Sequence, residues 1–265
     1  MKKILFGSCM APNADDFIRD VLDFLQQTAG IPIEFVDEMT WPEREAALDR
    51  GQIELGWICG LPYVWKADRN PPRATLLAAP VMDGERYRGQ PIYFSDVVVR
   101  RGSDFTDFSS LAQAVWGYNE PRSHSGYNLV RFELAKRGLN GDFFSQVVAT
   151  GSHQSAIKAI LRGKIDAAAI DSTVLETEMR REPELAKELR VIETFGPSPI
   201  PPIVASTGLD PELRRPIRDT LISMHQSSKG LACLQRHRVA RFVQVDDDSY
   251  DPIRAMDRVA RTISL

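Results

Sequence analysis

Two polar segments of this chain carry the residue types that bind an anion. One is Gly151–Ser155, which leads into an amphipathic run, and the other is Ser123–Asn128. Each pattern predicts the start of a helix, where hydroxyls, an imidazole and unpaired backbone N–H groups gather as hydrogen-bond donors. The helix dipole adds to their attraction for negative charge. Two such helix starts in one chain predict a receptor for a small oxyanion.

The serines of the second segment have a simpler role to weigh against ligand binding. An N-cap serine at this position would stabilise the helix by about 1 kcal/mol without touching any ligand. The Ser-x-Ser-Gly start, however, supplies more polar groups than capping requires, and Gly126 permits a close approach of the backbone. We therefore expect Ser123, Ser125 and Gly126 to contact the anion.

The histidines are distributed unevenly along the chain. His124 and His153 fall in the two helix starts, whereas His225 and His237 lie in the C-terminal helical region. A neutral imidazole donates one hydrogen bond to an oxyanion and a protonated one adds charge, so binding would depend on pH. The simpler alternatives are a hydrogen bond to the backbone for His153 and a solvated loop position for His124.

Three aromatic residues, Trp57, Tyr63 and Tyr93, are further candidates for a ligand site. Aromatic residues in strands usually belong to the core, but each of these offers a polar tip that could line a cleft wall. Tyr93 is the strongest of the three because its strand neighbours, Ile92 and Phe94, would face the opposite side.

Asp171 is a candidate because it stands at the end of a buried apolar run, Ile165–Ile170. Its carboxylate could cap the helix that Leu175 and Met179 indicate, and capping is the role we expect first. Capping does not exclude contact with a ligand, so Asp171 stays among the candidate site residues.

Alternating strands and helices must position these groups. The expected strands cover residues 4–6, 33–36, 53–58, 75–82, 92–101, 114–118, 146–149, 165–170 and 203–206. The expected helices cover residues 15–27, 127–137, 155–162, 211–225 and 251–263, and two more begin near residues 41 and 62. This alternation predicts an α/β protein with helices packed on mostly parallel sheets.

The alternation is interrupted twice, by extended stretches near residues 95–105 and 195–203. We therefore expect two lobes, with residues 1–98 and 200–265 in the first and residues 99–199 in the second. Ligands of such folds bind at the carboxyl ends of the strands, here in a cleft between the lobes.

Composition excludes several other classes of protein. The chain has 265 residues, 43% of them hydrophobic, and a net charge of −3, which gives no basic surface for nucleic acid. Its cysteines, Cys9, Cys59 and Cys233, form neither a disulfide framework nor a zinc pattern. We expect no metal, no cofactor and no catalytic residues.

The N-terminal residues are relevant to the cellular location of the protein. Two lysines precede an apolar run that ends at Gly7, far short of the roughly 7–15 residues of a signal peptide's apolar region. No apolar stretch approaches the roughly 20 residues of a membrane span. We expect a cytoplasmic protein for the sequence as given, and a periplasmic one if Met1 replaces a removed signal peptide.

Several segments, in order, resemble the phosphonate-, phosphate- and phosphite-binding components of ABC transporters. They are Glu54–Tyr63, Tyr93–Val99, Ser123–Asn128, Gly151–Ser172, and Pro201–Val204 followed by Leu209–Pro211. The resemblance covers most of the chain. It implies a two-lobed fold like that of the type II periplasmic binding proteins, with a hinged cleft.

The resemblance also implies roles for single residues. The family holds its oxyanion with a helix start rich in Ser and Thr, two tyrosines and a histidine. Ser123, His124 and Ser125 occupy that helix start, with His124 where the family usually has a small hydroxyl residue. His153 matches the family's histidine, and Asp171 could face an amino group on the ligand.

The function expected first is therefore capture of a small oxyanion for an ABC permease, by a monomer that neither binds nucleic acid nor inserts into membranes. A cytosolic enzyme and a ligand sensor on the same fold are the alternatives. For the enzyme, a Cys9–His nucleophile pair is conceivable only if the two side chains lie within hydrogen-bond reach.

Overall fold

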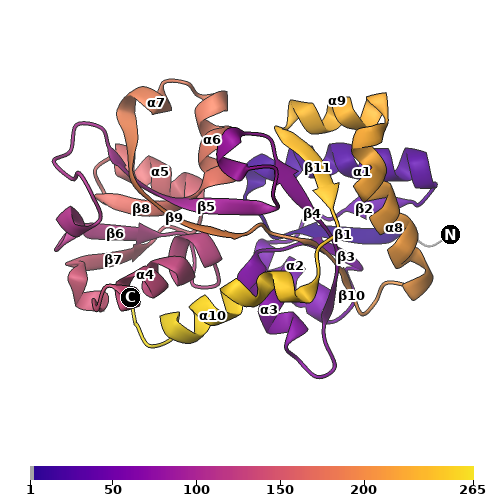
Figure 1. Cartoon of the computed structure of the whole chain (residues 1–265), viewed down its shortest axis with the longest axis horizontal. Coiled ribbons are helices and arrows are strands. Elements are labelled where there is room, and N and C mark those ends of the chain that lie inside the picture. The colour runs from indigo at the N-terminus through magenta and orange to yellow at the C-terminus, as the bar shows by residue number, and fades with distance from the viewer. Residues whose placement is uncertain (1–2) are drawn as a thin grey trace. The chain divides into compact units, whose positions relative to one another are not determined.

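The alternation expected from the sequence is present in the computed structural model, which describes residues 3–265 (Figure 1). The strands are β1 (Ile4–Ser8), β2 (Ile33–Phe35), β3 (Leu55–Trp57), β4 (Ala74–Met82), β5 (Ile92–Arg100), β6 (Val115–Tyr118), β7 (Gln146–Ala149), β8 (Ala167–Asp171), β9 (Leu189–Pro199), β10 (Ile203–Ser206) and β11 (Val239–Val243). The α-helices are α1 (Asp15–Ala29), α2 (Trp41–Asp49), α3 (Gly60–Ala67), α4 (Leu129–Lys136), α5 (His153–Leu161), α6 (Ser172–Arg181), α7 (Leu185–Glu188), α8 (Pro211–Ser223), α9 (Ser228–Arg236) and α10 (Asp251–Ala260).

The chain forms two units, and it passes between them three times. Unit 1 contains the residues up to Ile92 together with Pro199–Asp251, and unit 2 contains Tyr93–Ser198 together with Pro252–Leu265. This division differs from the expected one, 1–98 with 200–265 and 99–199. The last segment belongs to unit 2 because its apolar residues Met256, Ile263 and Leu265 pack against the core of that unit.

Unit 1 is built on a six-stranded sheet with the order β11-β4-β10-β3-β1-β2. Alternate residues of β1 and β3, among them Phe6 and Leu55, point into a core that α1, α8 and α9 cover. On the other face, Gly7 and Gly56 leave room for the side chains of α2. The sheet thus carries helices on both faces.

Unit 2 is built on a five-stranded sheet with the order β7-β6-β8-β5-β9. Trp116 and Ala169 lie on the face that packs against α4, where Leu134 belongs to the same core. Because side chains alternate along a strand, Val98 and Ile170 face the opposite side, where α5 packs on β8. This sheet, too, carries helices on both faces.

Both sheets are mixed, whereas the sequence predicts mostly parallel ones. Pairs β1–β2, β1–β3, β6–β7 and β6–β8 are parallel, but β10 runs antiparallel to β3 and β4, and β5 runs antiparallel to β8. The antiparallel strands adjoin the passages between the units. The chain enters these strands without the helical crossover that connects parallel neighbours, so they can pair antiparallel.

Two elements near the C-terminal end of unit 1, α9 and β11, are absent from the expected list. β11 pairs antiparallel with β4 and completes the sheet edge. Its short apolar run is interrupted by Arg241, which hides the pattern of a strand.

Within the described residues, no helix is both long and apolar enough to cross a lipid bilayer.

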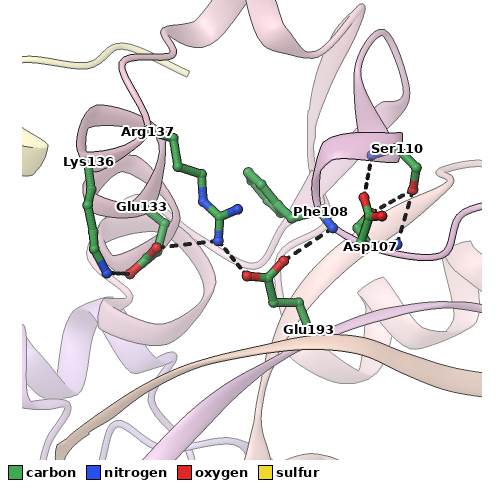
Figure 2. Close-up of polar contacts among 7 residues, drawn as sticks. All are labelled: Asp107, Phe108, Ser110, Glu133, Lys136, Arg137 and Glu193. Atoms are coloured by element: carbon green, nitrogen blue, oxygen red, sulfur yellow. Dashed lines mark hydrogen bonds and ion pairs between the residues drawn. The ribbon is translucent and has the colours of Figure 1, made fainter.

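A polar network joins α4 to β9 in unit 2 (Figure 2). The guanidinium of Arg137 pairs with Glu193 on β9, lies 3.6 Å from a carboxylate oxygen of Glu133, and sits 4.8 Å above the ring centroid of Phe108. Glu193 also accepts a hydrogen bond of 3.2 Å from the backbone N–H of Phe108. The C-terminal end of α4 is therefore fastened to the middle of β9.

Candidate functional site

The polar helix start at Ser123 is buried within unit 2. His124–Asn128 forms one π-helical turn, η4, which continues directly into α4. Ser123 is its N-cap, and its Oγ accepts a hydrogen bond of 3.1 Å from the backbone N–H of Gly126. Single π turns occur frequently at functional sites. The structure thus gives Ser123 the capping role that was weighed against ligand contact.

Gly126 is placed where no side chain fits. A Cβ atom at this position would lie 2.1 Å from Oδ1 of Asn119 and 3.1 Å from Cε1 of His153. Asn119 follows β6, and His153 begins α5. The missing side chain therefore lets η4 approach the carboxyl end of β6 and the start of α5 together, as expected for a glycine that permits close contact.

The two helix starts meet at the imidazole of His153. Its Nε2 lies 3.2 Å from Ser125 Oγ and 3.3 Å from Asn119 Nδ2. Because an amide Nδ2 only donates, Nε2 is the acceptor and Nδ1 carries the proton of the neutral ring. Nδ1 is buried and has no hydrogen-bond partner among residues 3–265. Ser152, the N-cap of α5, accepts from the backbone N–H of Ser155 at 3.0 Å.

His124 is buried as deeply but is bonded differently. Its side chain is 0% exposed, its Nε2 lies 3.0 Å from Ser198 Oγ, and its Nδ1 lies 3.3 Å from Asn128 Nδ2. Both ring nitrogens therefore have partners inside unit 2. The solvated loop position is therefore wrong, because the imidazole is buried and held by the protein, whereas ligand contact by His124 stays a prediction.

Burial also determines the charge of both histidines. It lowers the pKa of His124 to about 4, with a smaller opposing effect from the negative charge of Asp257. It lowers the pKa of His153 to about 4 as well. Both imidazoles are neutral at pH 7, so neither adds a positive charge to the site.

Tyr93 and Asp171 are also buried in unit 2. The ring of Tyr93 lies 6.5 Å from that of His124, between centroids. Asp171 caps α6, since its Oδ1 accepts from the backbone N–H of Thr173 at 2.8 Å and from the Thr173 hydroxyl at 2.7 Å. Burial raises the pKa of Asp171 to about 6. Capping, the role expected first, is the one seen.

Trp57 and Tyr63 belong to unit 1, where their polar atoms are engaged. Trp57 Nε1 donates to the carbonyl oxygen of Pro201 at 3.0 Å, and the Tyr63 hydroxyl donates to Asp247 Oδ1 at 2.6 Å. In the same unit, Cys9 Sγ contacts the carbonyl oxygen of Trp41 at 3.9 Å. These contacts hold the three side chains within unit 1, and a role of Trp57 and Tyr63 in ligand binding stays a prediction.

The site in unit 2 offers neutral donors rather than positive charge. Among the buried polar side chains of residues 3–265, the one ammonium or guanidinium group is that of Lys66 in unit 1, which pairs with Glu45 and Asp49. An anion at η4 and α5 would therefore be held by hydrogen bonds and helix dipoles. No group of three or more His, Cys, Asp or Glu in this part of the chain is arranged to hold a metal ion.

Sequence reasoning missed Asn119, Asn128 and Ser198, which bind the two imidazoles. A signal existed for Asn119, because a polar residue directly after a strand at its carboxyl end is well placed for a ligand site. Ser198 lies in a Pro-rich passage and carries no comparable signal.

Residues 13–250 match a family described as "ABC transporter, phosphonate, periplasmic substrate-binding protein". The chain belongs to this family. The match includes both helix starts and the strands that precede them, which confirms the resemblance seen in the sequence.

A curated relative is consistent with this assignment. The phosphonates-binding periplasmic protein of Escherichia coli (strain K12) is 26% identical over 173 residues, which are 63% of this chain and 51% of that protein. The aligned part thus spans about half of the relative's length. These relatives are named as binding proteins rather than enzymes.

The solved structures share the fold. A binding-protein component of an ABC phosphonate transporter from Pseudomonas aeruginosa has a TM-score of 0.85 at 20% identity, covering 98% of this chain and 86% of that one. PhnD1 from Prochlorococcus marinus (MIT 9301), in complex with methylphosphonate, has a TM-score of 0.84 at 16% identity and covers 99% of each chain. The expected α/β fold of the type II periplasmic binding proteins is thereby confirmed.

Proposed function

We propose that this chain captures a small phosphorus oxyanion of the phosphonate type as the substrate-binding component of an ABC transporter. The description of its family and the ligand named for the Prochlorococcus protein support the ligand class. The proposed contacts are His153, the hydroxyl of Ser125 and the backbone N–H groups at the start of η4. Ser123 and Gly126 shape this helix start, and Tyr93 lies beside it.

One observation carries the proposal, the buried Nδ1 of His153. A buried donor without a partner costs about 1–3 kcal/mol of stability. Nδ1 is such a donor, at the start of a nine-residue helix and beside a second helix start. An oxyanion enclosed there would accept its proton in a charge-assisted hydrogen bond, which is roughly twice as strong as a neutral one. The ligand would thus supply the bond that the protein lacks.

The first test is isothermal titration calorimetry at pH 7 with methylphosphonate, phosphate, phosphite and sulfate as separate probes. We expect at least one phosphorus oxyanion to bind more tightly than sulfate. If the folded protein binds none of the three phosphorus oxyanions, the proposal is contradicted.

The second test assigns the site. His153→Ala and Ser125→Ala should each weaken binding of that oxyanion by about 1–3 kcal/mol, the range for hydrogen bonds to charged groups. Ser155→Ala is the matched control, because its hydroxyl lies at the same helix start but is exposed and faces Ser152. Unchanged affinity in both site variants would show that the ligand binds elsewhere.

The proposal includes an ABC permease as partner and a periplasmic location for the mature protein, since the family is described as periplasmic. Closure of the other lobe over the ligand and a monomeric state remain predictions. Size-exclusion chromatography with light scattering would test the monomer.

A further inference from the structure

His124 stands among the residues proposed to hold the anion, yet its own contacts lead away from a ligand. Because Asn128 Nδ2 donates to Nδ1, the ring proton is on Nε2, which donates to Ser198 Oγ at 3.0 Å. The imidazole is 0% exposed. Both of its hydrogen-bonding atoms are therefore committed to the protein.

The partners of His124 lie where the chain passes between the units. Ser198 is the last residue of unit 2 before the chain enters unit 1 at Pro199, and Tyr93 is the first after the chain leaves unit 1 at Ile92. The third passage leads into α10, whose Asp257 is close enough for its charge to act on the pKa of His124. One imidazole thus faces residues from all three passages.

Two of these passages are also joined to each other. β5, which starts at Ile92, and β9, which ends at Pro199, are neighbours in the sheet of unit 2. Within unit 1 the same two segments are linked again, by the backbone N–H of Ile200 and the carbonyl oxygen of Pro91 at 3.0 Å. A displacement of Ser198 would therefore also displace Tyr93 near the start of β5.

We propose that His124 is a positioning residue that transmits occupancy of the anion site to the segments joining the two units. This inference rests on the proposed function. A ligand that fixes η4 through Ser125 and His153 also fixes the imidazole on that turn, and with it Ser198. Rearrangements between units are absorbed by a few residues at the ends of elements, which is where Ser198 and Tyr93 stand.

The segment η4–α4, which His124 joins to β9, contacts β9 at a second point. That contact supplies a control. Arg137 at the far end of α4 pairs with Glu193 on β9 (Figure 2). Glu193 is partly exposed and lies five positions before Ser198. Glu193→Gln therefore weakens the contact between η4–α4 and β9 without touching His124 or the passages.

The test is hydrogen exchange of the full chain, with and without saturating methylphosphonate, phosphate or phosphite, in wild type, Ser198→Ala, His124→Gln, His124→Ala and Glu193→Gln. In wild type, the probe should slow exchange at residues 123–126 and 93–95, and at Gly196 and Ser198 within 196–199, where Pro197 and Pro199 have no N–H. In Ser198→Ala and His124→Ala, the slowing at 123–126 should remain, while that at 93–95 and 196–199 is lost. Calorimetric affinity should fall about fivefold or more, the lower end of measured couplings between sites.

Two variants separate coupling from a merely structural role. His124→Gln keeps an N–H donor and should retain part of the ligand-dependent slowing that His124→Ala loses. Glu193→Gln should behave as wild type. Ser198→Ala keeps the imidazole in place, so the test does not depend on the folding of the His124 variants.

The outcomes also separate this inference from the proposed function. If no probe slows exchange at 123–126 in wild type, the proposed function fails and the coupling fails with it. If a probe protects 123–126, and 196–199 is protected equally in wild type and Ser198→Ala, the anion site stands and the coupling through His124 is refuted.

Discussion

The two histidines of unit 2 are both buried but are bonded differently. Burial lowers the pKa of each to about 4. His124 has protein partners at both ring nitrogens, whereas His153 has partners at Nε2 and none at Nδ1 among the described residues. One imidazole has both nitrogens bonded within the folded chain, and the other has one nitrogen that the proposed ligand would bond.

The difference shows that burial and pKa alone do not identify a ligand-binding residue. Stability is maximal where each buried polar atom has a partner, and binding sites depart from that rule. The two histidines differ in whether each ring nitrogen has a hydrogen-bond partner. Mutation can test this difference.

The largest expected effect is on stability. His124→Ala should lower the free energy of unfolding by about 3 kcal/mol, because it opens a cavity and leaves Ser198 and Asn128 buried without a partner. His153→Ala should cost only about 1–2 kcal/mol, since it also removes a buried N–H that has no partner. Urea denaturation of the ligand-free proteins at pH 7 measures both. Equal losses would mean that Nδ1 is satisfied without a ligand.

The second prediction concerns pH. A folded pKa of about 4 lies below the usual 6.5, so each histidine binds fewer protons when folded, and stability falls as pH drops from 6.5 toward 4. Each contributes at most about 1.4 kcal/mol per pH unit. Asp171 opposes this, because its pKa of about 6 exceeds 3.8 and its protonation stabilises the folded state over that range.

Urea denaturation between pH 7 and pH 4.5 checks this prediction, with slopes compared among variants. His124→Gln and His153→Gln should reduce the slope equally, since burial is the main cause in both. Asp171→Asn is the control in the opposite direction and should steepen the loss. Unequal slopes in the two glutamine variants would show that the rings differ in burial or that the charge of Asp257 acts strongly on His124.

The smallest effects are expected at the two N-caps. Ser123→Ala should cost about 1 kcal/mol, and Ser152→Ala about 0.5 kcal/mol, because the cap of η4 is buried and that of α5 is partly exposed. Thermal or urea denaturation would resolve the difference. Restoration by Ser123→Thr, which keeps the hydroxyl acceptor, would assign the loss to the cap. A larger loss of stability in Ser152→Ala than in Ser123→Ala would contradict the prediction that the more buried cap contributes more.

The sequence predicts the strands and helices that carry the site with small errors at their ends. For example, β7 and β10 have the expected bounds, whereas α5 begins at His153 rather than at Ser155. Periodicity reports which residues are apolar, and this is sufficient for elements with a regular pattern. It does not report strand direction, so the antiparallel pairing of β5 and β10 within sheets expected to be mostly parallel was not predicted.

The site was predicted as a set of residues and not as a set of bonds. The sequence indicates that His124 and His153 matter, but each occurs at a polar helix start directly after a serine. Their roles differ because Ser198, 74 residues from His124 along the chain, reaches one ring and not the other. A contact over such a separation depends on the register of β9, which no local pattern encodes.

The three passages between the units have a consequence for how the protein is made. Unit 1 needs residues up to Asp251, and unit 2 needs the segment Pro252–Leu265. During synthesis, domains generally fold as units in the order in which they emerge from the ribosome. Here neither unit is contiguous, so both stay incomplete until nearly all of the described chain has emerged. If the protein is exported as proposed, the export machinery would therefore meet a chain in which neither half has finished folding.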